Sequence, residues 1–175
     1  VYYLASPSVN VNTFRLWSQH WTQTTYVDES NYELTERNIN GEVYDRLYAN
    51  VLRDLSEARL ILEEDELVTA ADAKVQMAMI SLLEVYTYHV LVDIFNDVPY
   101  SSSNQLIDDL APSYDDAKTI YLDLGKRLDA IVADLGGSGS TGELGASDLI
   151  YNGDATLWVE FAHSLKLKLA LRLAD

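Results

Sequence analysis

The sequence contains no cysteine, and it has only three prolines and three histidines. The absence of cysteine excludes disulfide bonds, thiolate catalysis and cysteine-based metal centres. It does not decide the cellular compartment, because exported and cytoplasmic proteins can both lack cysteine. The histidines are His20, His89 and His163, and none lies four residues from another, as paired ligands on a helix would. We therefore predict no metal site and no cofactor.

Basic residues are also scarce. Twelve lysines and arginines face 28 aspartates and glutamates, which gives a formal net charge of −16. This balance argues against a nucleic-acid partner, because phosphate groups are bound mainly by basic side chains. It argues equally against electrostatic docking on anionic lipid. A neutral or cationic ligand, or a protein partner, fits the composition better.

We expect neither a signal peptide nor a membrane-spanning helix within this chain. Its first residues, VYYLASPSVN, lack a charged region followed by an apolar one, as a signal peptide would have. The longest apolar segment, residues 75–95, is interrupted by Gln76, Glu84, His89 and Asp93. Such interruptions indicate a buried core helix rather than a helix that crosses a membrane.

Apolar residues recur at steps of three and four over most of the chain, which indicates helices. The expected helices are a short one within residues 7–19 and long ones at about 41–64, 70–95, 114–135 and from 154 onward. No stretch alternates with period two, so no sheet is expected. The last helix is expected to bury a stripe made of Leu157, Phe161, Leu165, Leu169 and Leu173.

These helices predict an all-α fold of about five helices arranged in antiparallel hairpins, as in tetratricopeptide arrays. The expected organisation is a single domain over residues 1–175. It consists of a short helix and loop at 1–40, a helix pair at 41–96, a loop at 97–113 and a second helix pair at 114–175.

The central helix, 70–95, has recognisable start and stop signals. Thr69 can accept a hydrogen bond from the first turn as an N-cap. The segment DIFNDVPY at its end contains Asn96, which tolerates the left-handed conformation that terminates helices, and Pro99, which cannot continue one. The segment therefore predicts a sharp helix end followed by a chain crossing.

No pattern of catalytic residues is found. GSGSTG at 137–142 has the glycine spacing of a phosphate-binding loop, but Glu143 stands where that loop needs lysine. Asp148, Asn152 and Asp154 miss the order of a calcium-binding loop, and helix capping explains them better. No serine lies in a nucleophile elbow. We therefore expect no enzymatic activity.

The remaining candidate is aromatic. LWSQHWTQTTY places Trp17, Trp21 and Tyr26 among amide and hydroxyl side chains, at a helix end and in the loop that follows. Flat rings interleaved with such groups suit the apolar faces and hydroxyls of a sugar. Trp17 is expected to pack inward, whereas the sequence leaves both packing and display to solvent open for Trp21.

Four segments together resemble the SusD/RagB family of Bacteroidetes outer-membrane lipoproteins. They are the Trp/Gln-rich segment LWSQHWTQTTY, the Tyr-rich helix VYDRLYANVLRDL, YHVLVDIFNDVPYS and DLIYNGDATLWVEFAHSLKLKLALRLAD. For the last two the family reads D-x-F-G-D-x-P-Y and D-x-x-Y-x-G-D followed by W-x-x-F-A-N-S-L-K-L-R-L. The sequence departs from these patterns at Asn96, where glycine is usual, and at His163, where asparagine is usual.

The resemblance implies a tetratricopeptide-like scaffold that binds a nutrient without catalysis, often a glycan and in some members a peptide. It implies a partner, a SusC-like TonB-dependent transporter, and surface exposure at the outer membrane. Family members are several hundred residues long, so the chain is expected to be an N-terminal portion. The lipid-bearing cysteine and the C-terminal half would then lie outside it.

The family's sugar-stacking tryptophan lies near the segment matched here by Trp21 and Gln23. The resemblance therefore assigns ligand binding to Trp21, Gln23 and Tyr26. The sequence also fits an alternative function. A helical-repeat module could bind only protein through its acidic face, and its binding would then depend strongly on salt.

Overall fold

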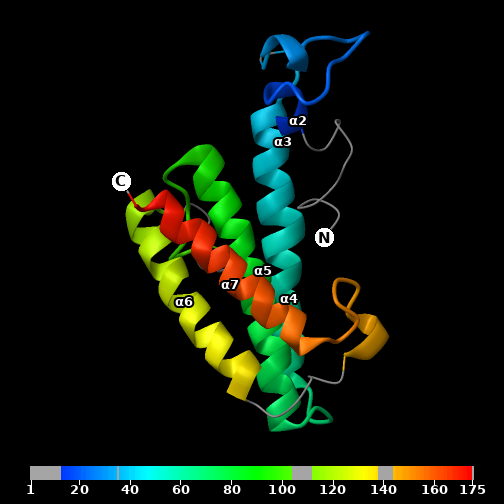
Figure 1. The fold of residues 1–175 in the computed structure, drawn as a ribbon, viewed down its shortest axis with the longest axis vertical. Coiled ribbons are helices and arrows are strands. Elements are labelled where there is room, and N and C mark those ends of the chain that lie inside the picture. The colour runs from blue at the N-terminus through cyan, green and yellow to red at the C-terminus, as the bar shows by residue number, and fades with distance from the viewer. Residues whose placement is uncertain (1–12, 35, 104–111, 138–143, 175) are drawn as a thin grey trace. The chain divides into compact units, whose positions relative to one another are not determined.

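A computed structural model describes residues 13–34, 36–103, 112–137 and 144–174 (Figure 1). The chain divides into two compact units, residues 1–51 and 52–175. Helices account for the secondary structure of the described residues, and no strand occurs among them. The one β-bridge there pairs Val98 with Asp115. The expected all-α class is confirmed.

The first unit contains short helical segments joined by a long loop. Helix α2 spans Phe14–Trp17, a 3₁₀ turn spans Glu29–Asn31, and α3 spans Ile39–Asp45. The short helix predicted within residues 7–19 thus appears as a single turn, and residues 7–12 lie outside the described residues. The side chain of Asn38 begins α3 by accepting a hydrogen bond of 3.2 Å from the backbone N–H of Gly41.

A π-helical segment, Arg46–Leu52, follows α3 and precedes α4, which spans Arg53–Glu64. The prediction of one ordinary helix over 41–64 missed this segment. A π turn places one extra residue in each hydrogen-bonded ring. The segment is too short for the spacing of its apolar residues to distinguish a π turn from an α turn.

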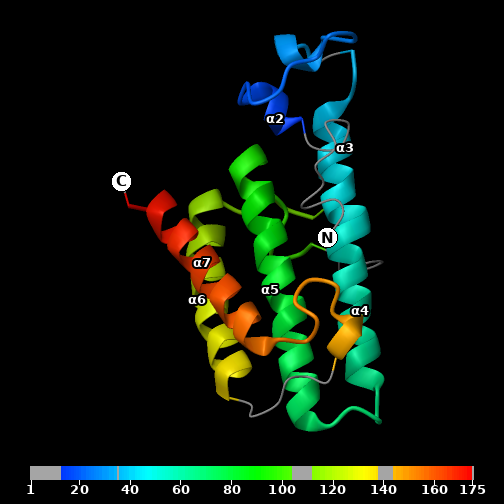
Figure 2. The same cartoon turned by 45° about the vertical axis from the view of Figure 1, so that its right-hand side comes forward.

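The second unit is built around α5, Ala70–Phe95, together with α4, α6 (Ala117–Gly137) and α7 (Ala155–Arg172). Helix α4 packs on α5, α5 on α6 and α6 on α7, and α7 also contacts α5 (Figures 1 and 2). Because three helices cover α5, it is apolar on most of its circumference. Its length and composition would also allow a membrane span, but half of its most apolar stretch is buried inside the protein.

Both ends of α5 lie where the sequence predicts them. Thr69 Oγ1 accepts a hydrogen bond of 3.2 Å from the N–H of Asp72 and begins the helix. Asn96 ends it with a φ of 65°, a value that L-residues other than asparagine and aspartate seldom adopt.

The chain that leaves α5 is tied to the start of α6. Asp115 Oδ2 accepts hydrogen bonds from the N–H groups of Tyr100 at 2.9 Å and Ser101 at 2.8 Å. In the reverse direction, Asp97 Oδ1 accepts from the N–H of Ala117 at 3.0 Å. The DVPYS segment therefore does more than stop a helix, because it connects the end of α5 to the beginning of α6.

Helix α6 begins three residues later than the predicted start at 114. Asp116 accepts a hydrogen bond of 2.8 Å from the N–H of Thr119 and so occupies the capping position. The neighbouring Asp115 instead binds the preceding loop.

Helix α7 begins at the predicted place, because the Asp154 side chain accepts from the N–H of Thr156 at 2.9 Å. The predicted stripe is partly wrong. The buried side chains are Trp158, Ala162, Leu165 and Leu169, while Leu157 and Leu173 are 38% and 40% exposed. A strict four-residue repeat turns about 40° per step around a helix of 3.6 residues per turn, so it leaves the buried face within a few turns.

Candidate functional site

The segment after α2 forms a loop closed by hydrogen bonds between Gln23 and Ser30. The Gln23 side-chain oxygen accepts from the N–H of Ser30 at 3.1 Å and from its hydroxyl at 3.0 Å. The N–H of Gln23 lies 3.2 Å from the Ser30 hydroxyl oxygen. These bonds join the two ends of an eight-residue segment, so the residues between them are held as a defined loop.

A buried carboxylate supports this closure. Glu29 is only 1% exposed, and its Oε2 accepts a hydrogen bond of 2.8 Å from the Gln23 side-chain nitrogen. Its other oxygen forms an ion pair with Arg37. The hydrogen bond from Gln23 lowers the pKa of Glu29, although burial acts in the opposite direction. The carboxylate therefore stays ionised and paired beneath the loop.

Two aromatic rings of this segment are displayed to solvent. Trp21 is 55% exposed, and Tyr26, between the two closing residues, is 88% exposed. The guanidinium carbon of Arg15 lies 5.6 Å from the centre of the Trp21 ring, within the range of a cation–π contact. Tyr26 has a φ of 54°, so its ring is projected from a left-handed turn. Among the ring contacts of the described residues, none joins Trp21 to Tyr26.

Trp17 differs from these two rings. It packs edge-on against Phe14 with ring centres 5.3 Å apart, and its carbonyl oxygen accepts a hydrogen bond of 2.6 Å from the Tyr32 hydroxyl. Its indole nitrogen is buried and has no hydrogen-bond partner in the described part of the chain. Trp17 thus packs into the first unit, as the sequence indicated.

The residues assigned to ligand binding therefore have different surroundings. Trp21 and Tyr26 offer open ring faces, whereas both ends of the Gln23 amide are bonded within the loop. The structure adds Glu29 and Ser30, which the sequence analysis did not single out. An acidic residue in a polar loop gives no sign of burial, so no sequence pattern could have found Glu29.

The acidic segment before α7 has a structural role. Asp148 accepts hydrogen bonds from the N–H groups of Ile150 at 2.9 Å, Tyr151 at 3.2 Å and Gly153 at 3.0 Å. Gly153 has a φ of 81°, and a Cβ there would lie 2.8 Å from the backbone nitrogen of Gly145. These bonds and the crowded left-handed position account for the aspartate and the glycine of this segment. No group of metal-binding side chains occurs in the parts of the chain that the structure describes.

A second polar cluster lies on α5 in the second unit. Glu84 accepts hydrogen bonds of 3.0 and 3.1 Å from Arg59 of α4, and it forms an ion pair with Arg127 of α6 at 2.5 Å. Arg127 also donates to the Tyr100 hydroxyl at 3.2 Å, and that hydroxyl donates to Asp123. Three helices are thereby joined through one partly buried carboxylate.

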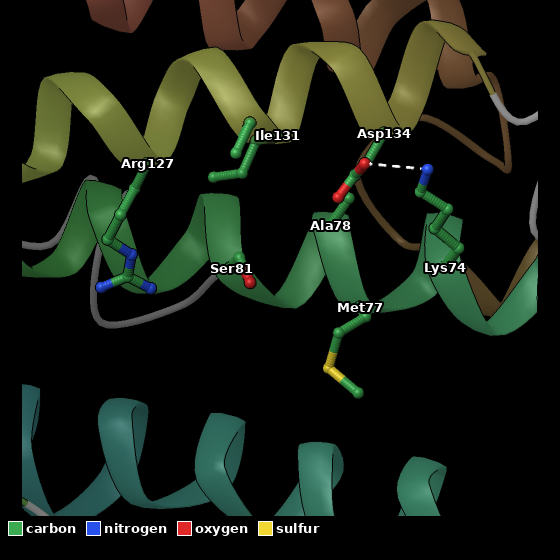
Figure 3. Close-up of a pocket in the computed structure, with 8 residues that line it drawn as sticks. Lys74, Met77, Ala78, Ser81, Arg127, Ile131 and Asp134 are labelled. Atoms are coloured by element: carbon green, nitrogen blue, oxygen red, sulfur yellow. Dashed lines mark ion pairs between the residues drawn. The ribbon is translucent and has the colours of Figure 1, made fainter.

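A groove of about 260 Å³ runs between α5 and α6 beside this cluster. Figure 3 shows Arg127 and Ile131 reaching from α6 toward α5, with Lys74 and Asp134 paired at the far end. The Lys74 nitrogen lies 3.0 Å from Oδ1 of Asp134. Met77 points toward α4, where its sulfur accepts a hydrogen bond of 3.0 Å from Arg59.

Similar solved structures include two that are described as chitin-binding. A chitin-binding protein shares 26% identity, with a TM-score of 0.73 over 92% of this chain and 33% of its own. A chitin-binding SusD homolog from Flavobacterium johnsoniae shares 27% identity, with a TM-score of 0.62 over 77% of this chain and 27% of its own. The chain thus spans between about a quarter and a third of the length of these structures. No curated protein matches it.

A protein-family model also matches this chain. The SusD-like model described as "Starch-binding associating with outer membrane" matches residues 1–175, which is the whole chain. The resemblance found in the sequence motifs is therefore confirmed. The chain belongs to this SusD-like family.

Proposed function

We propose that the protein binds a neutral glycan at the outer membrane without transforming it, and that Trp21 and Tyr26 supply the contact surface. The observation that carries this proposal is the display of both rings around a loop closed by hydrogen bonds. A sugar ring presents C–H groups on its flat faces, and these match the electron-rich face of an aromatic ring. A net charge of −16 favours a neutral ligand over an anionic one.

The hydrogen bonds beneath the loop support the same role. Binding to a flexible loop would cost the free energy of ordering its residues. Because Gln23, Ser30 and Glu29 already order this loop, less of that cost falls on binding. We propose that Gln23 contributes to affinity chiefly by this positioning of the loop.

Chitin and starch oligosaccharides are the first ligands to test, because two similar structures are described as chitin-binding and the family as starch-binding. We further propose, from family membership, that the bound glycan passes to a SusC-like TonB-dependent transporter. The proposed location is the cell surface, where a lipid anchor outside this chain would hold the protein.

Calorimetric titration of the intact protein tests the proposal. The ligands are a chitin oligosaccharide and a maltooligosaccharide, and the variants are Trp21→Ala and Tyr114→Ala. Loss of one stacked ring should weaken binding about tenfold or more. Tyr114 is a matched control, because it is a 66% exposed aromatic residue in the second unit.

Equal affinity of wild-type protein and Trp21→Ala for every bound glycan would remove the assignment of this surface. If no glycan binds and a protein partner binds in a strongly salt-dependent way, the protein-binding alternative is favoured instead.

A further inference from the structure

We propose that a pocket made wholly by the second unit is an additional binding site for a single neutral sugar unit. The pocket has a volume of about 300 Å³ and lies where α4, α5 and α6 meet the turn after α5. Five of its lining side chains carry hydroxyl groups: Ser56, Tyr88, Tyr100, Ser101 and Ser103. No residue of the aromatic loop takes part, so this site is additional to the surface proposed above.

The size and walls of the pocket suit one pyranose ring. Its volume is at the lower end of the range for small-molecule sites, which starts at about 300 Å³. Tyr88 and Tyr100 meet edge to face, with ring centres 4.7 Å apart and planes at 84°. Tyr88 is buried and its hydroxyl is bonded to Ser103, so this wall is rigid. Rigid aromatic walls bind a small ligand with little loss of side-chain freedom.

The charges around the pocket favour a neutral ligand. Arg59 and Arg127 both pair with Glu84, and Arg127 also reaches the Tyr100 hydroxyl at 3.2 Å. Asp123 accepts from that hydroxyl, and Asp115 accepts from the Ser101 hydroxyl at 2.9 Å. The lining side chains of the pocket and their partners thus include three carboxylates and two guanidinium groups. An anion entering here would lose its hydration without gaining an excess of positive charge.

The hydroxyl groups of the pocket match the chemistry of a sugar. A serine or tyrosine hydroxyl can donate one hydrogen bond and also accept, as a sugar hydroxyl can. Burial and the hydrogen bond to Asp123 raise the pKa of Tyr100 to about 12, so its hydroxyl remains protonated at neutral pH. The hydroxyls of Tyr100 and Ser101 already donate to carboxylates, and Ser103 donates to a backbone carbonyl, so these oxygens would accept hydrogen bonds from a polyol. The hydroxyl of Ser56 can supply a donor.

The neighbouring groove in Figure 3 lacks these features, although it shares Arg127. Its lining is largely apolar, with Met77, Ala78, Ala130 and Ile131, and Lys74 and Asp134 pair at its far end. It offers Ser81 as its hydroxyl group, whereas the proposed pocket offers five. The hydroxyl-lined pocket therefore suits a sugar better than this groove does.

The test uses the intact protein carrying Trp21→Ala and Tyr26→Ala, so that the aromatic loop contributes nothing. Glucose, N-acetylglucosamine and glucuronate are titrated and followed by protein-observed NMR. A neutral monosaccharide should bind with a dissociation constant on the order of 1 mM and shift the amide signals of Ser101 and Ser103. Glucuronate should bind at least ten times more weakly.

Adding Ser56→Leu should fill the pocket and weaken neutral monosaccharide binding at least tenfold. Ser164→Leu, on an exposed position of α7, should leave it unchanged. If Ser56→Leu does not fold, Tyr88→Phe is used, and severalfold weaker binding is expected. The proposal is overturned if the starting variant binds no neutral monosaccharide, or if pocket substitutions leave binding intact. Failure of the aromatic-loop proposal would appear separately, as oligosaccharide binding unaffected by Trp21→Ala.

Discussion

The indole nitrogen of Trp158 donates a hydrogen bond of 2.7 Å to Oδ2 of Asp148, and this pair fastens the loop before α7 to the buried face of that helix. Both side chains are buried. With the three backbone N–H groups that it also accepts from, Asp148 has a full set of partners. Even a conservative replacement of this carboxylate should therefore lower the stability of the protein.

Asp148→Asn should destabilise the protein by about 2 kcal/mol at pH 7, because an amide cannot accept from all of these donors and has lost the charge. Burial alone would raise the pKa of Asp148, but the hydrogen bonds from Trp158 and the loop lower it overall. The stabilisation is therefore complete above the ordinary pKa of aspartate, 3.8, and is lost as the pH falls below it.

Urea unfolding of wild type and variant at pH 7 and pH 3 measures this effect. The difference in unfolding free energy between wild type and Asp148→Asn should be smaller at pH 3 than at pH 7. Asp129→Asn is the control, because Asp129 makes an exposed ion pair with Lys166. Its replacement should lower the unfolding free energy by less than about 1 kcal/mol. A gap that is the same at both pH values would show that the charge of Asp148 contributes nothing.

Gln23→Ala should loosen the aromatic loop without removing either exposed ring. The substitution deletes the acceptor for the N–H of Ser30 and the donor to Glu29. The lost hydrogen bond to the N–H of Ser30 is worth about 1 kcal/mol, and the other hydrogen bonds of the Gln23 side chain are lost with it. Amide hydrogen exchange at Ser30 should therefore speed up about tenfold or more. Glycan affinity should fall along with it.

Thr24→Ala is the matched control for this loop, because Thr24 is an exposed neighbour in the same segment. Exchange at Ser30 should be unchanged in that variant. Equal exchange rates in Gln23→Ala and Thr24→Ala would mean that the Gln23 amide does not hold the loop together.

Glu84→Gln should lower stability by about 2–3 kcal/mol, because it leaves Arg59 and Arg127 without the carboxylate that they share. Asp134→Asn breaks the more exposed pair with Lys74 and should cost less than about 1 kcal/mol. Denaturant midpoints of the two variants provide the comparison. Similar small losses in both would show that Glu84 is not the junction of α4, α5 and α6.

The helical fold could be predicted where local chemistry decides it. The bounds of α5 followed from an apolar repeat, a Thr69 cap and the stop at Asn96, each of which acts over a few residues. The buried face of α7 was less predictable, because several leucines compete for it and tertiary packing selects Trp158 and Ala162.

The candidate site was predictable only in part. A run of aromatic and amide residues marks the segment, but exposure of Trp21 and burial of Glu29 depend on how the loop closes. Three hydrogen bonds between Gln23 and Ser30 decide that closure, and no periodicity marks them.

The decisive measurement is a crystal structure of the intact protein with a bound oligosaccharide. We expect a sugar ring stacked on the indole of Trp21, with the loop from Gln23 to Ser30 in the same closed arrangement. A bound oligosaccharide that leaves both Trp21 and Tyr26 uncovered would contradict this expectation.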